Sequence, residues 1–467
     1  MKKVSKIYEM SLYELNQMAK WVAAILPVKV RYGKDFFNRA AWLEKSQWWS
    51  RERLIEYQNE RLRRLIIHAY NNVPYYHSLF KEKGIRPSDI HTLHDLPKIP
   101  LLTKEVLRKK LRDLVASNVS KKDLIYLTTS GTTGQPVGFY REKKSEYSDG
   151  DPFWWRRYQW GGCGLVSRRA ALTSWTIQPK RNGTRRIFSY NPFRRLLILS
   201  TYDLSRKNIA QYAHALRKYK PEFISGFPSA LEVMVKYFAE AGIPRPVNPK
   251  NIFTQSEEIY PWQRKRIREY FGCEIYDWYG MEERVVCASE CEEHSGHHIF
   301  AEHSIVEFIK DGKWVSGEEG EIIATDLENY GMPMIRYQTG DIGQAVLEKC
   351  RCGRGLPLMK LIGGRERSFA VTKEGGYIPV SIVDIPKATE HVEQFQFVQK
   401  ERGTLILKVV RKEGFCDKDV GLIRKNLQEK FGEMIAVRLE FVEDIARTGR
   451  GKLPLLVQHL RIDEDLV

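Results

Sequence analysis

Residues 128–138 read Thr-Thr-Ser-Gly-Thr-Thr-Gly-Gln-Pro-Val-Gly, and this stretch says more about the fold than any other. It holds five hydroxyl side chains and two glycines between Thr128 and Gly134. Glycine permits positive φ and lets backbone amides approach a ligand. Successive amides, together with hydroxyls, donate to the oxygens of an anion. We interpret the stretch as a phosphate-binding loop. An ordinary Gly/Thr turn is the alternative, and the Gly-Lys-Ser/Thr ending of a Walker loop is missing.

The chain on either side of this loop alternates short apolar runs with helical patterns. Residues 124–127 predict a strand that leads into the loop. Further strands are expected at 196–200, 223–225, 252–254 and 274–278, and helices at 209–219, 229–241 and 260–270. This rhythm predicts an α/β fold with a largely parallel sheet covered by helices. From about Ser304 the pattern changes to hairpin-like strands at 305–310, 313–315 and 321–325, which predicts a β-rich subdomain.

The N-terminal part of the chain reads as helical. Residues 51–70 carry helical periodicity that ends before Pro74, and Thr103 is expected to cap another helix. The apolar run at 21–28 is far shorter than the ~18 residues needed to span a bilayer. We expect it to form a helix packed on the body of the protein. Peripheral membrane contact by a basic amphipathic segment is the alternative.

A domain boundary is expected near Gly364. It separates a large N-terminal domain, residues 1–364 including an N-terminal helical extension, from a small mobile C-terminal domain, residues 365–467. The last ~100 residues are enough for a small domain. Strand-like runs at 405–410 and 437–441 flank a helical pattern at 418–431, which predicts an α+β fold.

The charge balance favours anionic ligands. The chain of 467 residues carries 76 Lys+Arg against 58 Asp+Glu, a formal net charge of +18. Nucleic acid or an acidic membrane surface would also suit this charge. However, the basic residues are spread in small clusters without a nucleic-acid-binding motif, so we expect a solvated basic surface and no nucleic-acid partner. The odd number of cysteines, seven, favours a reducing cytoplasm.

Two motifs place a carboxylate next to a predicted glycine turn. Tyr279-Gly280 with Glu283 lies beyond a strand end, where ligands commonly bind in α/β sheets. Tyr279 can stack on a nucleobase and Glu283 can hold Mg²⁺, although a helix start is the alternative. Asp341 follows Gly340 in a predicted turn. It can accept two ribose hydroxyls, or it can bond the backbone of its own turn.

Two further segments complete the set. Lys452 ends the glycine-containing segment 447–452, where a lysine is a mobile cation able to reach a phosphate. A solvated basic tail is the alternative. A substrate pocket is expected at Gly226, Phe227, Pro228 and Ser229, with the aromatic residues of 153–160 beside it. A packed aromatic core is the alternative for those aromatics.

In this order, the motifs resemble those of the adenylate-forming superfamily, and within it the phenylacetate–CoA ligase family with its CapK-type relatives of capsular polysaccharide biosynthesis. The resemblance covers most of the chain and includes three N-terminal segments, residues 72–76, 95–97 and 102–104. It implies catalytic roles for Lys452 and for Glu283 with Mg²⁺. It implies nucleotide binding by Thr129, Ser130, Gly131, Thr132, Thr133, Gly134, Ser256, Glu257, Tyr279, Gly280, Asp341 and Arg365.

Three residues depart from the family pattern. Gln135 stands where lysine is frequent, which weakens the positive charge at the loop. Glu282 replaces a Ser or Thr and adds a negative charge that a metal or Arg284 would have to offset. Arg367 falls where an acidic hinge residue is common, which reverses the charge at the hinge of the C-terminal domain.

Cysteines and histidines are concentrated between residues 287 and 352. Cys350 and Cys352 can place two thiolates on one ion, and a tetrahedral Zn²⁺ site needs two more ligands. The family resemblance implies the set Cys291, His298, Cys350 and Cys352, with His297 or Cys287 as substitutes. Four protein ligands leave no open position, so the role would be structural. Unconnected thiols and histidines are the alternative.

The resemblance implies a cytoplasmic enzyme that activates a carboxylic acid with ATP and Mg²⁺ as an acyl- or aryl-adenylate and then forms a thioester with CoA. Attack of a carboxylate on the α-phosphate brings two anions together, so cations and donors must absorb the charge. One alternative sends the acyl group to an amine, a hydroxyl or a carrier in surface-polysaccharide biosynthesis. An alternative of another class is a non-enzymatic binder of polyanions or membranes. The acid and the oligomeric state stay open.

Overall fold

The computed structural model of the protein describes residues 24–128, 137–143, 151–173, 186–201, 203–361, 369–374, 377–380, 389, 391–445 and 455–460. These residues belong to two compact units. The first comprises the described parts of Met1–Trp42 and Trp155–Asp277, and the second those of Leu43–Trp154 and Trp278–Val467.

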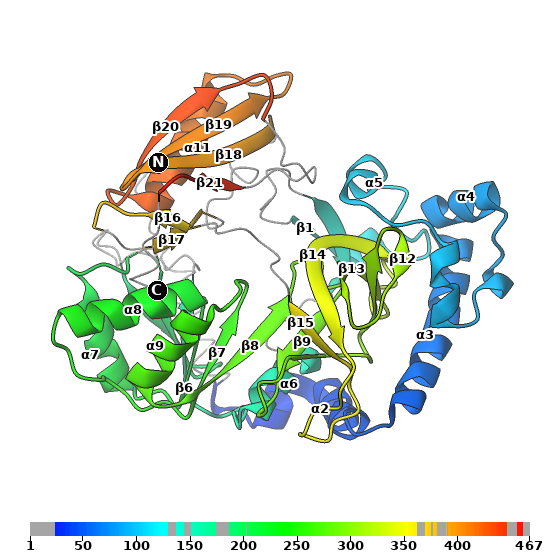
Figure 1. The fold of residues 1–467 in the computed structure, drawn as a ribbon, viewed down its shortest axis with the longest axis horizontal. Helices are drawn as coiled ribbons and strands as arrows, with labels where there is room; N and C mark the ends of the chain where they lie inside the picture. Colours follow the sequence, from blue (N-terminus) through cyan, green and yellow to red (C-terminus); the bar gives the residue numbers. More distant parts are fainter. Residues whose placement is uncertain are drawn as a thin grey trace. The chain divides into compact units, whose positions relative to one another are not determined.

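The first unit contains the predicted parallel sheet. Its parallel strands are β3 (Arg169–Thr173), β5 (Leu196–Ser200), β6 (Phe223–Gly226) and β7 (Asn251–Gln255), in the order β7-β6-β3-β5. An antiparallel strand, β4 (Phe188–Asn191), closes the edge beside β5. Helices α7 (Ile209–Tyr219), α8 (Pro228–Glu240) and α9 (Pro261–Phe271) pack side by side along the sheet (Figure 1). All four residues of β6 are buried, as expected for a strand inside a parallel sheet.

The second unit is built on antiparallel strands. In spatial order they are β9 (Cys287–Glu290), β10 (His297–Ile299), β15 (Leu358–Leu361), β14 (Tyr337–Val346), β13 (Glu319–Asp326), β11 (Ser304–Lys310) and β12 (Lys313–Trp314). The end of β8 (Glu274–Gly280) pairs with β9, with Trp278 opposite Ser289. The change from parallel to hairpin-like strands that the sequence predicts is therefore confirmed.

Helices from the N-terminal part of the second unit pack on these antiparallel strands. Helix α3 (Arg51–Asn72) begins at Ser50, whose hydroxyl accepts from the amide of Arg53, and α4 (Pro74–Lys83) follows after the break at Pro74. Leu62, Leu65 and Ile66 of α3 are fully buried in the largest hydrophobic core. The short helix α5 (Lys104–Lys109) is capped by Thr103, as predicted, at 3.2 Å from the Val106 amide.

The expectation that the apolar run at 21–28 packs on the body is wrong for its described residues. Ile25 is 84% exposed and Val30, which follows the run in α2 (Val28–Ser46), is 62% exposed. The run lacks a continuous apolar stripe, because Pro27 interrupts it. In the part of the chain that the structure describes, no helix combines the length and the apolar character needed to cross a bilayer.

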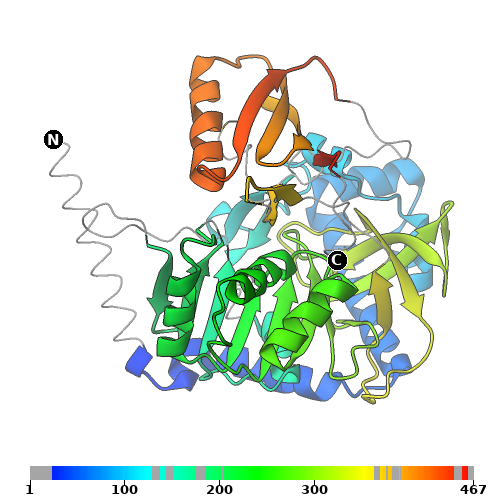
Figure 2. The same cartoon turned by 60° about the vertical axis from the view of Figure 1, so that its left-hand side comes forward.

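The C-terminal residues have a hydrophobic core of their own. Strands β18 (Val392–Glu401), β19 (Thr404–Arg411), β20 (Ala436–Phe441) and β21 (Leu456–Gln458) form a mixed sheet in the order β20-β19-β18-β21, and β16 (Phe369–Val371) pairs with β17 (Tyr377–Pro379). Helix α11 (Asp417–Phe431) lies against the four-stranded sheet (Figure 2), with Phe431 packed on Phe397. This arrangement confirms the predicted α+β fold.

Candidate active site and metal centre

The strands beside the predicted phosphate-binding loop form a hairpin. β1 (Leu124–Thr128) pairs antiparallel with β2 (Gly138–Glu142), and Thr128 lies opposite Gly138. A strand thus leads into the loop, as predicted, and a second strand leads out of it. The predicted phosphate-binding residues Thr129, Ser130, Gly131, Thr132, Thr133 and Gly134, and the departure Gln135, lie outside the described residues.

Glu283 is a buried carboxylate held at two points. It follows β8 in a turn closed by a 3.0 Å hydrogen bond from the Arg284 amide to the Met281 carbonyl, so the alternative of a helix start does not apply. The Tyr337 hydroxyl donates to Glu283 Oε1 at 2.6 Å, and the Arg141 guanidinium donates to the Glu283 carbonyl at 2.9 Å. Arg141 is itself buried and paired with Asp326 at 3.2 Å.

The second oxygen of the Glu283 side chain has no hydrogen-bond partner among the described residues. A carboxylate oxygen of this kind is a ligand that Mg²⁺ prefers. The neighbouring Glu282 is exposed, so only one of the two adjacent carboxylates is buried with these partners. The donor set therefore fits the magnesium role that the sequence predicts for Glu283.

Asp341 lies in a bulge and not in the predicted turn. It is part of the ten-residue strand β14, whose pairing with β13 shifts register between Glu321 and Ile323. Gly340 takes φ +84° there, a value that side-chain-bearing residues rarely adopt. The Asp341 carboxylate accepts from the Tyr279 hydroxyl at 2.9 Å. A β-bulge next to a binding site commonly redirects a side chain in this way.

Residues 102–104, one of the N-terminal segments that resemble the family, form hydrogen bonds to the start of the same strand, β14. Leu102 forms a parallel bridge with Tyr337, and its amide and carbonyl bond to Arg336 and Gln338 at 3.0 Å each. The following Lys104 donates to the Thr339 carbonyl at 2.8 Å. A segment some 235 residues away in the sequence therefore fixes the start of β14 and the bulge that carries Asp341.

The predicted acid pocket and adenine-side segment both belong to the first unit. Gly226 ends β6, and Phe227, Pro228 and Ser229 lead into α8. Glu257 accepts from the Ser229 amide at 3.2 Å, which joins the two predicted segments. Burial raises the pKa of Glu257 to about 7, although hydrogen bonds from Ser229 oppose the shift. The preceding Ser256 is exposed, with φ +68°.

The aromatic residues of the 153–160 segment are buried. In the first unit, the Tyr158 ring packs edge-to-face on Phe253 at 4.7 Å, and Trp155 is 2% exposed. In the second unit, Phe153 packs on Phe300. These contacts favour the alternative of a packed aromatic core over an acid-binding surface.

The predicted catalytic lysine and the hinge-side arginine cannot be placed. Lys452 and Arg365, with Gly364 and the departure Arg367, lie outside the described residues. Their roles stay predictions.

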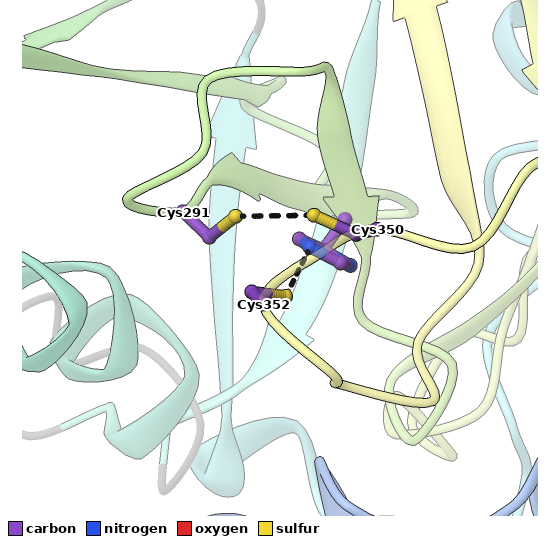
Figure 3. Close-up of side chains that lie close together, drawn as sticks. Cys291, Cys350 and Cys352 are labelled. Atoms are coloured by element: carbon purple, nitrogen blue, oxygen red, sulfur yellow. Dashed lines mark hydrogen bonds between the residues drawn. The ribbon is translucent and has the colours of Figure 1, made fainter.

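The four predicted zinc ligands lie close together. The ligand atoms of Cys291, His298, Cys350 and Cys352 all lie within 4.8 Å of one another. The sulfur atoms of Cys291 and Cys350 point toward each other at 3.6 Å (Figure 3), and His298 Nε2 is 3.3 Å from the Cys352 sulfur. Cys291 follows β9, His298 lies on β10, and the other two lie between β14 and β15. The substitutes His297 and Cys287 are not part of the set.

The surroundings of this Cys₃His cluster suit a metal. His298 Nδ1 lies 3.2 Å from the Leu356 carbonyl and donates to it, which leaves Nε2 as the ligand atom. Burial lowers the pKa of His298 to about 4, so the ring is neutral near pH 7. Three sulfurs and one imidazole nitrogen match a closed tetrahedral zinc site.

The loop that carries Cys350 and Cys352 is anchored to the N-terminal side of the second unit. The Gly355 amide donates to the Gln47 carbonyl at 2.9 Å, and Arg354 Nε donates to the Gln47 side chain at 2.9 Å. Arg354 also makes a two-point ion pair with Glu292 and stacks on Trp48. A Cβ at Gly355 would lie 1.8 Å from the Trp49 carbonyl oxygen, so this close approach requires glycine.

The sequence reasoning missed Tyr337, Arg141 and Asp326. A signal for Tyr337 could have come only from the alternation of residues 337, 339 and 341, but Thr-Gly-Asp reads as a turn and hides the strand. Arg141 had no such signal, since a buried arginine cannot be told from a surface arginine by its residue type alone.

Comparison with known proteins bears on the whole chain. Residues 370–459 match the family described as the CapK C-terminal domain. Protein CapK of Staphylococcus aureus is 23% identical over 453 residues, covering 93% of this chain and 94% of that protein. The phenylacetate-coenzyme A ligase of Escherichia coli (strain K12) is 28% identical and covers 76% of this chain and 82% of the ligase. That of Thermus thermophilus is 26% identical, with coverages of 76% and 80%.

Solved structures share the fold. The structure of 2-hydroxyisobutyryl-CoA ligase with 2-HIB-AMP and CoA in the thioesterification state matches with a TM-score of 0.57 and 20% identity, over 86% of this chain and 89% of that chain. An open conformation of the same ligase matches with a TM-score of 0.53 and 21% identity, over 84% and 89%. The fold is therefore that of adenylate-forming ligases.

Proposed function

Because the chain belongs to the CapK and phenylacetate–CoA ligase family of adenylate-forming ligases, we propose that it is an acid–CoA ligase that activates a small carboxylic acid with ATP. The observation that carries the proposal is the pair of carboxylates Glu283 and Asp341, each on a family motif and each held by a tyrosine hydroxyl. The phosphate-binding loop 129–134 and Lys452 would act with them.

The proposed chemistry has two steps. A carboxylate oxygen of the acid attacks the α-phosphorus of ATP, and the bond to the β-phosphate breaks, which gives an acyl-adenylate and pyrophosphate. The sulfur of CoA then attacks the acyl carbon, with loss of its proton, and AMP leaves. Both steps bring negative charges together, so preorganised donors and cations must lower the barrier. Asp341 would orient the ribose by accepting its two hydroxyls.

Magnesium would bind at Glu283 through the carboxylate oxygen that Tyr337 does not contact. When bound, it would neutralise charge on the phosphates. Glu257 and residues 226–229 would contribute to nucleotide and acid binding in the first unit.

The test is carboxylate-dependent exchange of labelled pyrophosphate into ATP over a panel of aryl, acyl and amino acids, followed by product analysis with and without CoA. Exchange with at least one acid, and a CoA thioester as product, is the expected result. Lys452→Ala should suppress acyl-adenylate formation, and unchanged exchange would remove Lys452 from the mechanism.

A second candidate keeps adenylation and changes the acceptor. The similarity to protein CapK covers 93% of this chain, whereas the similarity to the phenylacetate-coenzyme A ligases of Escherichia coli and Thermus thermophilus covers about three quarters of it. This favours testing an amine, a hydroxyl or a carrier as the acyl acceptor in surface-polysaccharide biosynthesis. Exchange that needs no CoA, together with a failure to form the thioester, would support it.

A third reading treats the +18 charge as the functional feature, in a non-enzymatic binder of polyanions or membranes. Steeply salt-dependent binding of DNA or of anionic vesicles, without exchange for any acid, would favour it over both ligase readings. The exposed Ile25 and Val30 are where peripheral membrane contact would occur. We also propose a cytoplasmic location, because none of the seven cysteines forms a disulfide.

We further propose that Cys291, His298, Cys350 and Cys352 bind a structural zinc ion. Metal analysis of the purified protein should find about one zinc per chain. Chelation should lower the unfolding temperature, and Cys352→Ser should lower the zinc content. Cys163→Ser is the matched control, because that thiol is buried elsewhere. If the purified protein contained no zinc and its unfolding temperature did not change on chelation, the proposed zinc site would be wrong.

A further inference from the structure

Two segments of the second unit are joined by a crossed pair of tyrosine–carboxylate hydrogen bonds. The Tyr279 hydroxyl donates to Asp341 at 2.9 Å, and the Tyr337 hydroxyl donates to Glu283 at 2.6 Å. Each segment thus supplies one tyrosine and one carboxylate, separated by four residues (283 − 279 and 341 − 337). The crossed pair therefore ties each carboxylate to the other segment.

The two tyrosines differ in their access to a ligand. Tyr279 is half-buried at the end of β8, whereas Tyr337 is fully buried at the first position of β14. Leu102 bonds to the residues on both sides of Tyr337, which keeps the backbone in place.

From this arrangement we propose that Tyr337 is a positioning residue for the divalent cation that accompanies ATP. It touches neither the nucleotide nor the metal. Its hydroxyl holds Oε1 of Glu283, which directs the other carboxylate oxygen to the cation. Loss of a hydrogen bond that orients a metal ligand typically weakens metal binding about 10- to 100-fold. The inference rests on the proposed function, because it presumes that Glu283 meets a metal–nucleotide complex.

The test replaces one hydroxyl. Tyr337→Phe keeps the buried ring and removes only the donor to Glu283. We would measure Mn²⁺ binding by electron paramagnetic resonance, with the enzyme and the non-hydrolysable analogue α,β-methylene-ATP. The expected result is a rise in the Mn²⁺ dissociation constant of at least about tenfold. Binding of the same analogue without metal should not change, because the ribose contact of Asp341 is intact.

Tyr76→Phe is the matched control. Tyr76 is equally buried in the same core, but its hydroxyl serves only the backbone, as a donor to Pro333 at 3.2 Å and an acceptor from Ile335 at 3.0 Å. We expect this variant to lower stability and to leave the Mn²⁺ affinity unchanged. Equal losses of Mn²⁺ affinity in both variants would mean a general packing effect and would overturn the proposal.

A second variant tests whether Tyr337 acts through Glu283. Glu283→Asp draws the carboxylate away from the Tyr337 hydroxyl, so adding Tyr337→Phe to it should cost little further Mn²⁺ affinity. Additive losses would overturn the positioning role. If the wild-type enzyme binds Mn²⁺ with the analogue and Tyr337→Phe binds it equally well, only this inference fails. If the wild-type enzyme binds no Mn²⁺ with the analogue, the proposed function fails with it.

Discussion

At the scale of single residues, Glu257 should make stability depend on pH. Its pKa of about 7 in the folded protein lies above its ordinary value of 4.5. Between these values the folded state holds a proton that the unfolded chain has lost, so the free energy of unfolding falls as pH rises, by at most about 1.4 kcal/mol per pH unit. Glu257→Gln should flatten this decline in urea unfolding, whereas Glu269→Gln, at an exposed position, should keep it.

Arg336 lies immediately before β14, and we expect its substitution to lower the free energy of unfolding strongly. Its guanidinium makes two hydrogen bonds to the buried Glu307, at 2.9 and 3.0 Å, and one to the Ile99 carbonyl at 2.7 Å. Arg336→Met leaves a carboxylate buried without its partner, which should cost about 3–5 kcal/mol in denaturant unfolding. Adding Glu307→Gln should recover part of this loss, and the exposed Arg402→Met should cost almost nothing. If Arg336→Met and Arg402→Met lowered the free energy of unfolding equally, the buried ion pair would not be the cause.

What could be foreseen at the residue scale depended on local signals. Thr103 was predictable as a cap because serine and threonine before a helical pattern accept backbone hydrogen bonds. The four zinc-site residues required the family resemblance, since their spacing alone did not select among the nearby histidines. Tyr337 and Arg141 were missed because their partners lie 54 and 142 residues away, and no local pattern reports such pairing.

At the scale of elements, the β14 bulge should be sensitive to any side chain. Gly340 has φ +84°, and an added Cβ would approach the Lys104 ammonium at 3.6 Å. Gly340→Ala should cost about 1–2 kcal/mol of strain and should displace Asp341. We therefore expect a raised KM for ATP with a smaller change in kcat. Gly312→Ala, at a turn with φ +77° and open space, should cost similar stability without altering KM. An unchanged KM in Gly340→Ala would argue against the ribose role.

Elements with strong periodicity were predicted closely. The helix at 209–219 and the strand at 196–200 have the predicted bounds, because their apolar spacing and flanking residues agree. Strand β14 was not foreseen, since Thr-Gly-Asp in the middle of it reads as a turn. The long-range pairing of the flanking residues, 337–338 and 342–344 with β13, carries the strand across this bulge.

At the scale of the whole molecule, unfolding should not be two-state. The C-terminal core around Phe397 and the large core around Phe139 share no residue. Phe397→Ala should remove about 3–5 kcal/mol from the C-terminal transition in calorimetry and leave the other transition in place. Phe139→Ala should instead lower the transition of the large core and leave the C-terminal transition in place. A single transition that both variants lower equally would show that the cores unfold together.

The general α/β plan and the small C-terminal fold were predictable from patterns, but the membership of the two units was not. The described part of Met1–Trp42 belongs with Trp155–Asp277, although more than a hundred residues separate them in the sequence. Such grouping depends on contacts that periodicity does not encode. The proposed boundary at residue 364 stays a prediction.

The anchoring of the 350–355 loop on Gln47 bears on how the chain folds during synthesis. Arg354 meets Gln47 across 307 residues of sequence. At about 5–20 residues per second, a ribosome would need roughly 15–60 seconds to deliver the second partner after the first. During that interval the apolar side of helix α3, with Leu62, Leu65 and Ile66, lacks its distant half of the core. Nascent chains of this protein should therefore depend on chaperones until just over three quarters of the sequence has emerged.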